Sequence, residues 1–162
     1  MNTPVTAPRF KILDLARAID QSHAMDALRC QFSEPNWEIL SAYLKPMLAS
    51  DAEVLFTKGS TDRTLFLVET GALSVHYEDE KGRVRMAIVA SGSVVGEGSF
   101  FAHQPRNATV QASGNSKLWC LTPLRFSELS NRHSPIALEL GLALASVMAR
   151  RLYNRLKRVA VT

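Results

Sequence analysis

The sequence is poor in cysteine and has no long hydrophobic run. Its two cysteines, Cys30 and Cys120, lie far apart and outside any CxxC or metal-ligand spacing, so reduced thiols in the cytosol are expected. The N-terminal residues MNTPVTAPRF contain no apolar segment of the kind found in signal peptides. The longest nearly uncharged apolar stretch, residues 136–149, contains Glu139 and is too short to span a bilayer. The sequence therefore predicts a cytoplasmic protein with no membrane segment.

Charge of neither sign dominates the chain. It contains 19 basic and 15 acidic residues, with a formal net charge of +4, and the excess is concentrated in the C-terminal segment MARRLYNRLKRV. Positive charge near a helix C-terminus is favoured by the helix dipole in any protein. Nucleic-acid binding by this basic cluster is therefore the less favoured interpretation; the cluster comprises Arg150, Arg151, Arg155, Lys157 and Arg158.

The first third of the chain predicts helices. Residues 1–32 are expected to form a helical extension of two short helices broken near residues 21–22, because apolar residues recur there at helical spacing. A further helix is expected in the segment 33–52, with Ser33 as its N-cap and its end before Pro46. Nothing in the sequence assigns a role to the extension.

Residues 53–122 have a different texture. Short segments of alternating apolar and polar residues are separated by Gly, Asp and Asn, and the segment EDEKGR predicts a hairpin turn. Many short strands at regular spacing favour an antiparallel β-roll, also called a jelly roll or double-stranded β-helix. Helices resume over residues 123–160, where Thr122 and Ser134 are expected N-caps, each followed by proline. The predicted fold is therefore α+β, an antiparallel β-roll flanked by N-terminal helices and a long C-terminal helix.

The last predicted helix carries two apolar faces. One series has alternating spacings of four and three, which is the a/d pattern of a coiled-coil seam. The other series occupies only the first half of the helix. This pattern favours packing of the first half on the β-roll and pairing of the seam with a second copy in a homodimer; a helix folded back on its own domain is the alternative. The seam comprises Leu138, Leu142, Ala145, Ala149, Leu152, Leu156 and Val159, and the other series comprises Ile136, Leu140, Leu144 and Val147 or Met148.

The stretch GEGSFFAHQPRNATV, residues 96–110, interrupts the predicted strands with an acid and an arginine. If Glu97 and Arg106 point into one cavity of the roll, each is costly to bury alone, and a ligand can supply the partners. A carboxylate accepts hydrogen bonds from hydroxyl groups, and a guanidinium is a planar fork that fits two phosphate oxygens. The residues GSFF suit a short helical turn whose N–H groups at Gly98 and Ser99 attract an anion. The set predicts a pocket for a small sugar phosphate with a free hydroxyl.

This stretch resembles the phosphate-binding cassette of the cyclic nucleotide-binding domain family, which includes the bacterial catabolite activator and the regulatory subunits of cyclic-nucleotide-dependent kinases. The resemblance extends to EVLFTKGSTDRTLFLVETGALSV, to LWCLTPLRFSEL and to MARRL in the last helix, and covers about residues 37–159. It implies a cyclic nucleotide-binding domain over residues 33–162, with a β-roll at 53–122 and the cassette at 96–110. The matching cassette residues are Gly96, Glu97, Pro105, Arg106, Ala108, Thr109 and Val110.

The resemblance also implies a role for each cassette residue. Glu97 would accept a hydrogen bond from the ribose 2′-hydroxyl, and Arg106 would pair with the exocyclic oxygens of the 3′,5′-cyclic phosphate. Backbone groups at Gly98 and Ser99 would complete the anion site. The alternative is that Glu97 and Arg106 pair with each other in a pocket that has lost its ligand.

Base recognition is expected from two further places. Asn107 replaces the small residue that usually follows the arginine, where a hydroxyl can favour guanine in the family. Alignment on MARRL brings Asn154 and Arg155 near the purine, although both suit solvated helix positions equally well. Cyclic AMP is the expected ligand on family frequency, and cyclic GMP remains open. The expected ligand-binding set is Gly96, Glu97, Gly98, Ser99, Arg106, Asn107, Ala108, Asn154 and Arg155.

The expected function is a stand-alone cyclic nucleotide sensor without a cofactor, which relays ligand binding through its C-terminal helices to an unidentified downstream protein. The sequence ends where the helix-turn-helix of the catabolite activator would begin, so direct DNA binding is not expected. One alternative is an interaction module of the same fold that has lost its ligand or binds a cyclic dinucleotide. Another is a cupin-type enzyme, which needs two or three histidines and a carboxylate around a metal. The chain has no HxH pair among its four histidines, so neither a metal nor an enzyme activity is expected; the histidines are His23, His76, His103 and His133.

Overall fold

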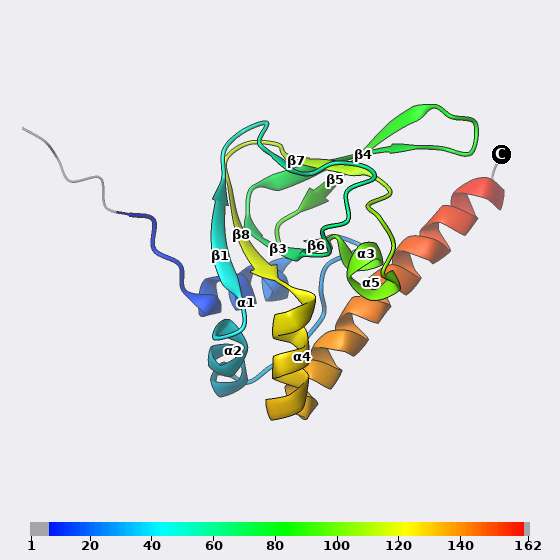
Figure 1. The fold of residues 1–162 in the computed structure, drawn as a ribbon. Helices are drawn as coiled ribbons and strands as arrows, with labels where there is room; N and C mark the ends of the chain where they lie inside the picture. The colour runs from blue at the N-terminus through cyan, green and yellow to red at the C-terminus, as the bar shows by residue number, and fades with distance from the viewer. Residues whose placement is uncertain (1–6, 161–162) are drawn as a thin grey trace, which may run out of the picture.

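The alternating segments in the middle of the chain form two antiparallel sheets that wrap into a β-roll (Figure 1). A computed structural model describes residues 7–160, with side chains as far as residue 155. Each sheet has four strands, and the predicted β-roll is confirmed. In the order of hydrogen bonding, the first sheet contains β1 (Lys45–Ala49), β8 (Ser116–Leu121), β3 (Leu65–Thr70) and β6 (Val94–Val95), and the second contains β2 (Val54–Phe56), β7 (Thr109–Ala112), β4 (Ala72–Glu78) and β5 (Val84–Ala90).

Helices lie below the roll and along one side of it (Figure 1). Two of the predicted N-caps are present, because Ser33 Oγ and Thr122 Oγ1 each accept a backbone N–H from three residues further along the chain, at 3.3 Å. Ser134 is not an N-cap as predicted. It is already helical, and the carbonyl of His133 accepts the first helical hydrogen bonds instead. The helices are α1 (Ile12–Gln21), α2 (Glu34–Ser41), α3 (Glu97–Ala102), α4 (Pro123–Arg132) and α5 (Ser134–Ala160).

Apolar residues bury both faces of the first sheet. Its inner face meets the second sheet in a core that includes Phe66, Val68 and Leu118, with Leu73 and Val110 from the opposite sheet. Its outer face carries a second cluster, which residues of α1, α2, α4 and α5 complete. Because burial of this apolar area is the main stabilising contribution, the helices are fixed against the roll that carries the site.

Two predictions for the first third of the chain are wrong. The second short helix before residue 32 is absent: the backbone forms only one turn, from the carbonyl of Ala24 to the N–H of Ala27, and then bonds to the roll. The N–H of Leu28 donates to the carbonyl of Gly92 at 2.8 Å. The helix expected in segment 33–52 ends at Ser41 and is followed by β1. Pro46 lies within this strand, where it is tolerated because β1 is at the edge of its sheet and needs fewer donors.

The two apolar faces of α5 have different environments. The series from Ile136 to Val147 is buried against the domain, with Leu140 and Leu144 completely inaccessible. The seam is exposed over its described part, where Leu138, Leu142 and Leu152 have exposed fractions of 64%, 63% and 58%. Leu156 and Val159 lie outside the described side chains, as do Lys157 and Arg158 of the basic cluster. The described part of the seam therefore does not fold back on its own domain. None of the described helices is long and apolar enough to cross a membrane.

Candidate functional site

The cassette forms a sharp turn between β6 and α3, and this turn requires glycine. Gly96 has a φ of +89° and precedes the first residue of α3. A Cβ atom at this position would lie 2.7 Å from both Arg106 Nη1 and the carbonyl oxygen of Thr64. Both the positive φ and the close approach exclude a side chain, so the sequence places glycine where the backbone passes next to the arginine.

Arg106 is fixed at the inner end of the site. Its side chain is buried, with 2% of the residue exposed, and its guanidinium carbon lies 3.8 Å from the centre of the Phe56 ring. Nη1 donates to the carbonyl of Gly96 at 3.2 Å, and Nη2 donates to the carbonyl of Thr64 at 2.6 Å and to Asp62 Oδ2 at 2.7 Å. The buried Nε has no hydrogen-bond partner among the described residues, so one donor of the guanidinium is unsatisfied.

Asp62 is the only carboxylate that accepts a hydrogen bond from Arg106 within the described part of the chain. Partial burial alone would raise the pKa of the Asp62 carboxyl. Hydrogen bonds from Arg106 and Thr64 outweigh this effect and lower the pKa below its ordinary value. The carboxylate is therefore charged near neutral pH. Because about half of its side chain is exposed, the carboxylate would stay solvated, and not be left buried and unpaired, if Arg106 bound an anionic ligand in its place.

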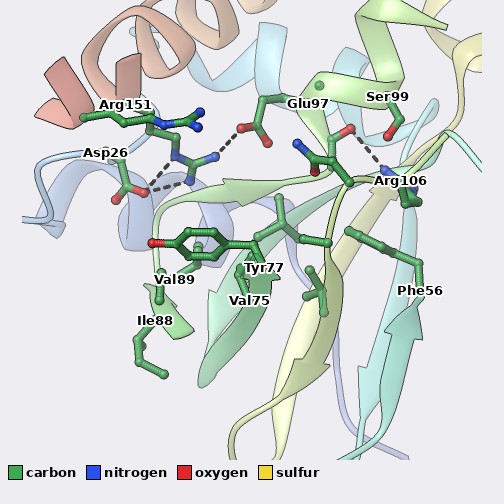
Figure 2. A pocket seen from close by; sticks show the side chains of 18 of the residues that line it. Asp26, Phe56, Val75, Tyr77, Ile88, Val89, Glu97, Ser99, Arg106 and Arg151 are labelled. Atoms are coloured by element: carbon green, nitrogen blue, oxygen red, sulfur yellow. Dashed lines mark hydrogen bonds and ion pairs between the residues drawn. The ribbon is translucent and has the colours of Figure 1, made fainter. Parts of the chain in front are cut away.

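Glu97 has a different arginine as its partner. Arg151 on α5 donates from Nη1 to Glu97 Oε1 at 2.5 Å (Figure 2). The same guanidinium donates to Asp26 Oδ2 from Nε at 3.0 Å and from Nη2 at 2.7 Å, and to the carbonyl of Val94 at 2.7 Å. Burial alone would lower the pKa of Arg151, but Glu97 and Asp26 outweigh it and raise the pKa. The pairing of Glu97 with Arg106, considered above as a sign of a lost ligand, is therefore not present.

Asp26, Glu97, Arg106 and Arg151 line one cavity of about 590 Å³ between the roll and α5. Figure 2 shows Glu97 and Arg106 among the side chains that line it, together with Phe56 of β2 and Val75 and Tyr77 of β4. Asn154 is half-buried and Arg155 is exposed in the wall that α5 contributes. All nine residues predicted from the sequence line this cavity, namely Gly96, Glu97, Gly98, Ser99, Arg106, Asn107, Ala108, Asn154 and Arg155.

Sequence reasoning did not select Arg151, Asp26 or Asp62 as site residues. Arg151 lies in the MARRL segment that carries part of the resemblance, but the prediction assigned it to a basic cluster. Asp26 and Asp62 are single acids in polar segments, and no local pattern distinguishes them from solvated residues. Their contacts join parts of the chain that are far apart in sequence.

The described residues contain little that suggests catalysis. No group of three His, Cys, Asp or Glu side chains that could hold a metal ion occurs between residues 7 and 155. Burial raises the pKa of Cys30 to about 12 and that of Cys120 to about 11. Neither thiol is therefore ionised near neutral pH, which makes both poor nucleophiles.

Comparison with known proteins places the chain in a family. The family model described as "Cyclic nucleotide-binding domain" matches residues 49–133. A regulatory subunit of cAMP-dependent protein kinase from Blastocladiella emersonii is 30% identical over 98 residues, which are 60% of this chain and 24% of the relative. The chain thus spans about a quarter of the length of this curated relative.

Solved structures agree on the fold. A cyclic nucleotide-binding domain from Methylobacillus flagellatus has a TM-score of 0.79 at 19% identity, over 92% of this chain and 82% of that one. The catabolite activator protein of Thermus thermophilus has a TM-score of 0.69 at 21% identity, over 89% of this chain and 62% of that one. The chain belongs to the cyclic nucleotide-binding domain family.

Proposed function

We propose that the chain is a sensor that binds a cyclic mononucleotide, with cyclic AMP preferred, and requires no cofactor. The observation that carries this proposal is the cavity, in which Arg106 and Glu97 lie together against a wall formed by α5. The free Nε of Arg106 and the exchangeable Asp62 contact support a site for the cyclic phosphate. Glu97 Oε1 is held by Arg151, which directs the carboxylate towards the ribose 2′-hydroxyl.

Two contacts of α3 would carry the ligand signal to the C-terminal helices. The ring of Phe126 on α4 packs edge-on against Phe100 and Phe101 of α3, with centroid distances of 5.5 and 6.4 Å. Glu97, the first residue of α3, is tied to α5 through Arg151. Movement of α3 upon ligand binding would therefore shift both helices, provided that the ligand binds the shifted state more tightly.

The exposed seam of α5 supports a homodimer as the route by which this shift leaves the domain. Its leucines have heptad spacing, and those that the structure describes are exposed and not buried against the rest of the chain. An unidentified downstream protein would then receive the signal.

A thermal-shift titration tests the proposed function. Cyclic AMP, cyclic GMP, cyclic di-GMP and linear 5′-AMP are added to the whole chain, and the melting temperature is followed, since a ligand that binds the native state raises stability by mass action. We expect cyclic AMP to raise the melting temperature by several degrees and linear 5′-AMP to have little effect. A response to cyclic di-GMP alone would support the cyclic dinucleotide alternative, and no response to any cyclic form would contradict the proposal.

Replacing Asn154 or Arg155 with alanine should change base preference more than overall affinity. Both residues line the cavity from α5, whereas the proposed phosphate site at Arg106 lies on the roll, so they are expected to contact the base and not the phosphate. We expect the ratio of cyclic AMP to cyclic GMP affinity to change by about three- to tenfold in at least one variant, because a single base contact contributes on this scale. Isothermal titration calorimetry with both nucleotides measures the ratio. An unchanged ratio in both variants would rule out a base contact from these residues.

A further inference from the structure

The segment between α1 and α2, residues 22–33, contributes to the wall of the cavity. Met25 and Asp26 line the cavity together with the cassette residues, although the cassette begins 70 positions later in the sequence, at Gly96. They belong to the N-terminal extension, to which neither the sequence nor the family match at 49–133 assigns a role. Their position raises the question of what this segment does at the site.

The segment is held firmly in place. The N–H of Leu28 donates to the carbonyl of Gly92 at 2.8 Å, and Ser93 Oγ donates to the carbonyl of Asp26 at 2.6 Å. Leu28 is completely buried. Gly92 has a φ of +83°, and a Cβ atom there would lie 2.7 Å from the carbonyl oxygen of Ala18, so the end of α1 packs directly on this turn. The position of the Asp26 carboxylate is therefore set by the roll.

Two consecutive arginines of α5 hold this segment. Arg150 donates from Nη1 to the carbonyl of Met25 at 2.5 Å and from Nη2 to the carbonyl of Ala27 at 2.7 Å. Arg151 binds Asp26 through two nitrogens and uses its remaining nitrogen, Nη1, for Glu97. Asp26 and Glu97 thus share the guanidinium of Arg151, and of these three residues only Glu97 belongs to the cassette.

We propose that Asp26 is a positioning residue of the ligand site, acting through Arg151 to hold the Glu97 carboxylate in the orientation that accepts the ribose 2′-hydroxyl. The inference rests on the proposed function, since it concerns a ligand with a free 2′-hydroxyl. The two-nitrogen contact with Asp26 fixes the plane of the guanidinium, and this plane determines where Nη1 meets Glu97 Oε1. Without it, Arg151 keeps Glu97 as its single anionic partner and only the neutral acceptors of Val94 and Ser93, which hold the plane of the guanidinium less firmly.

The variant Asp26→Asn tests this role, because it preserves the shape of the side chain and removes its charge. Affinities for cyclic AMP and for 2′-deoxy-cyclic AMP are measured by calorimetry on the whole chain. We expect the variant to bind cyclic AMP about fivefold more weakly and 2′-deoxy-cyclic AMP less than twofold more weakly. The free energies of a charge-assisted and a neutral hydrogen bond differ on this scale. Preference for the 2′-hydroxyl therefore falls. Asp20→Asn is the matched control, because Asp20 is exposed on α1, and it should leave both affinities unchanged.

A second background separates positioning from a general loss of structure. In Glu97→Gln the preference for the 2′-hydroxyl should already be small, and adding Asp26→Asn should not reduce it further. If Asp26→Asn lowers the affinities for both ligands equally, and so leaves the preference for the 2′-hydroxyl unchanged, the inference is overturned while the proposed function stands. If the parent chain binds neither nucleotide, the proposed function fails first and the positioning role fails with it. Thermal melts of each variant confirm that it is folded during the titrations.

Discussion

Replacing Arg106 with alanine should weaken cyclic AMP binding by about 30- to 150-fold, since charged hydrogen bonds to a phosphate contribute about 2–3 kcal/mol in total. The guanidinium is buried and already oriented by the carbonyl groups of Gly96 and Thr64. Little conformational entropy is therefore lost when it binds an anion, and the other two arginines that line the cavity, Arg151 and Arg155, are less buried. Calorimetry on the whole chain measures the loss.

The same variant should also lower the melting temperature. Truncation removes a donor from the partly buried carbonyl groups of Gly96 and Thr64. The Gly96 carbonyl still accepts from the N–H of Phe100, whereas an unsatisfied carbonyl at Thr64 costs about 1–3 kcal/mol. Two controls separate this effect from binding. Arg106→Lys keeps the charge without the planar fork, so we expect an intermediate affinity. Arg125→Ala removes an exposed arginine on α4 and should bind like the parent. A folded Arg106→Ala chain with parental affinity would show that the anion site is elsewhere.

Replacing Leu152 with glutamate should convert a dimer into monomers. In the proposed seam this leucine faces its counterpart on a second copy, and a pair of buried, unpaired carboxylates there would oppose association strongly. Sedimentation velocity at concentrations where the parent chain dimerises gives the molar mass directly. Leu124→Glu on α4 is the matched control, because Leu124 is equally apolar and 70% exposed but lies outside the seam.

The outcome for this pair is unambiguous. We expect the Leu124 variant to sediment with the parent and the Leu152 variant to sediment at half its mass. A parent chain that is monomeric throughout, or a Leu152 variant that remains dimeric, would contradict the proposed role of the seam. Because Leu152 is exposed within one copy, its replacement should leave the melting temperature of the monomer nearly unchanged.

Local patterns predicted the parts of the site that lie close together in the sequence. Glu97 and Arg106 belong to one short segment. Gly96 in the same segment has the positive φ that glycine adopts readily. The partners of these two groups could not be predicted in the same way. Asp62 and Arg151 reach them only after the roll has closed and α5 has docked, and such long-range pairs carry no periodicity or spacing in the sequence.

The errors in the fold have the same origin. Residues 24–30 have apolar spacing that favours a helix. The non-helical conformation is more stable here because Leu28 hydrogen-bonds to Gly92 and its side chain is buried. Pro46 was interpreted as the end of a helix, whereas it lies in an edge strand. In both places a tertiary contact overrides the local preference.

The family region and the cavity do not coincide. Residues 49–133 contain the cassette and most of the strands, but the wall opposite is made by Met25, Asp26, Arg151, Asn154 and Arg155. A related protein can therefore share the part of this cavity proposed to bind the phosphate and have different residues in the part proposed to contact the base. Base specificity should therefore vary more among related proteins than phosphate binding does. A fragment limited to residues 49–133 would lack part of the cavity wall that is present in the intact chain.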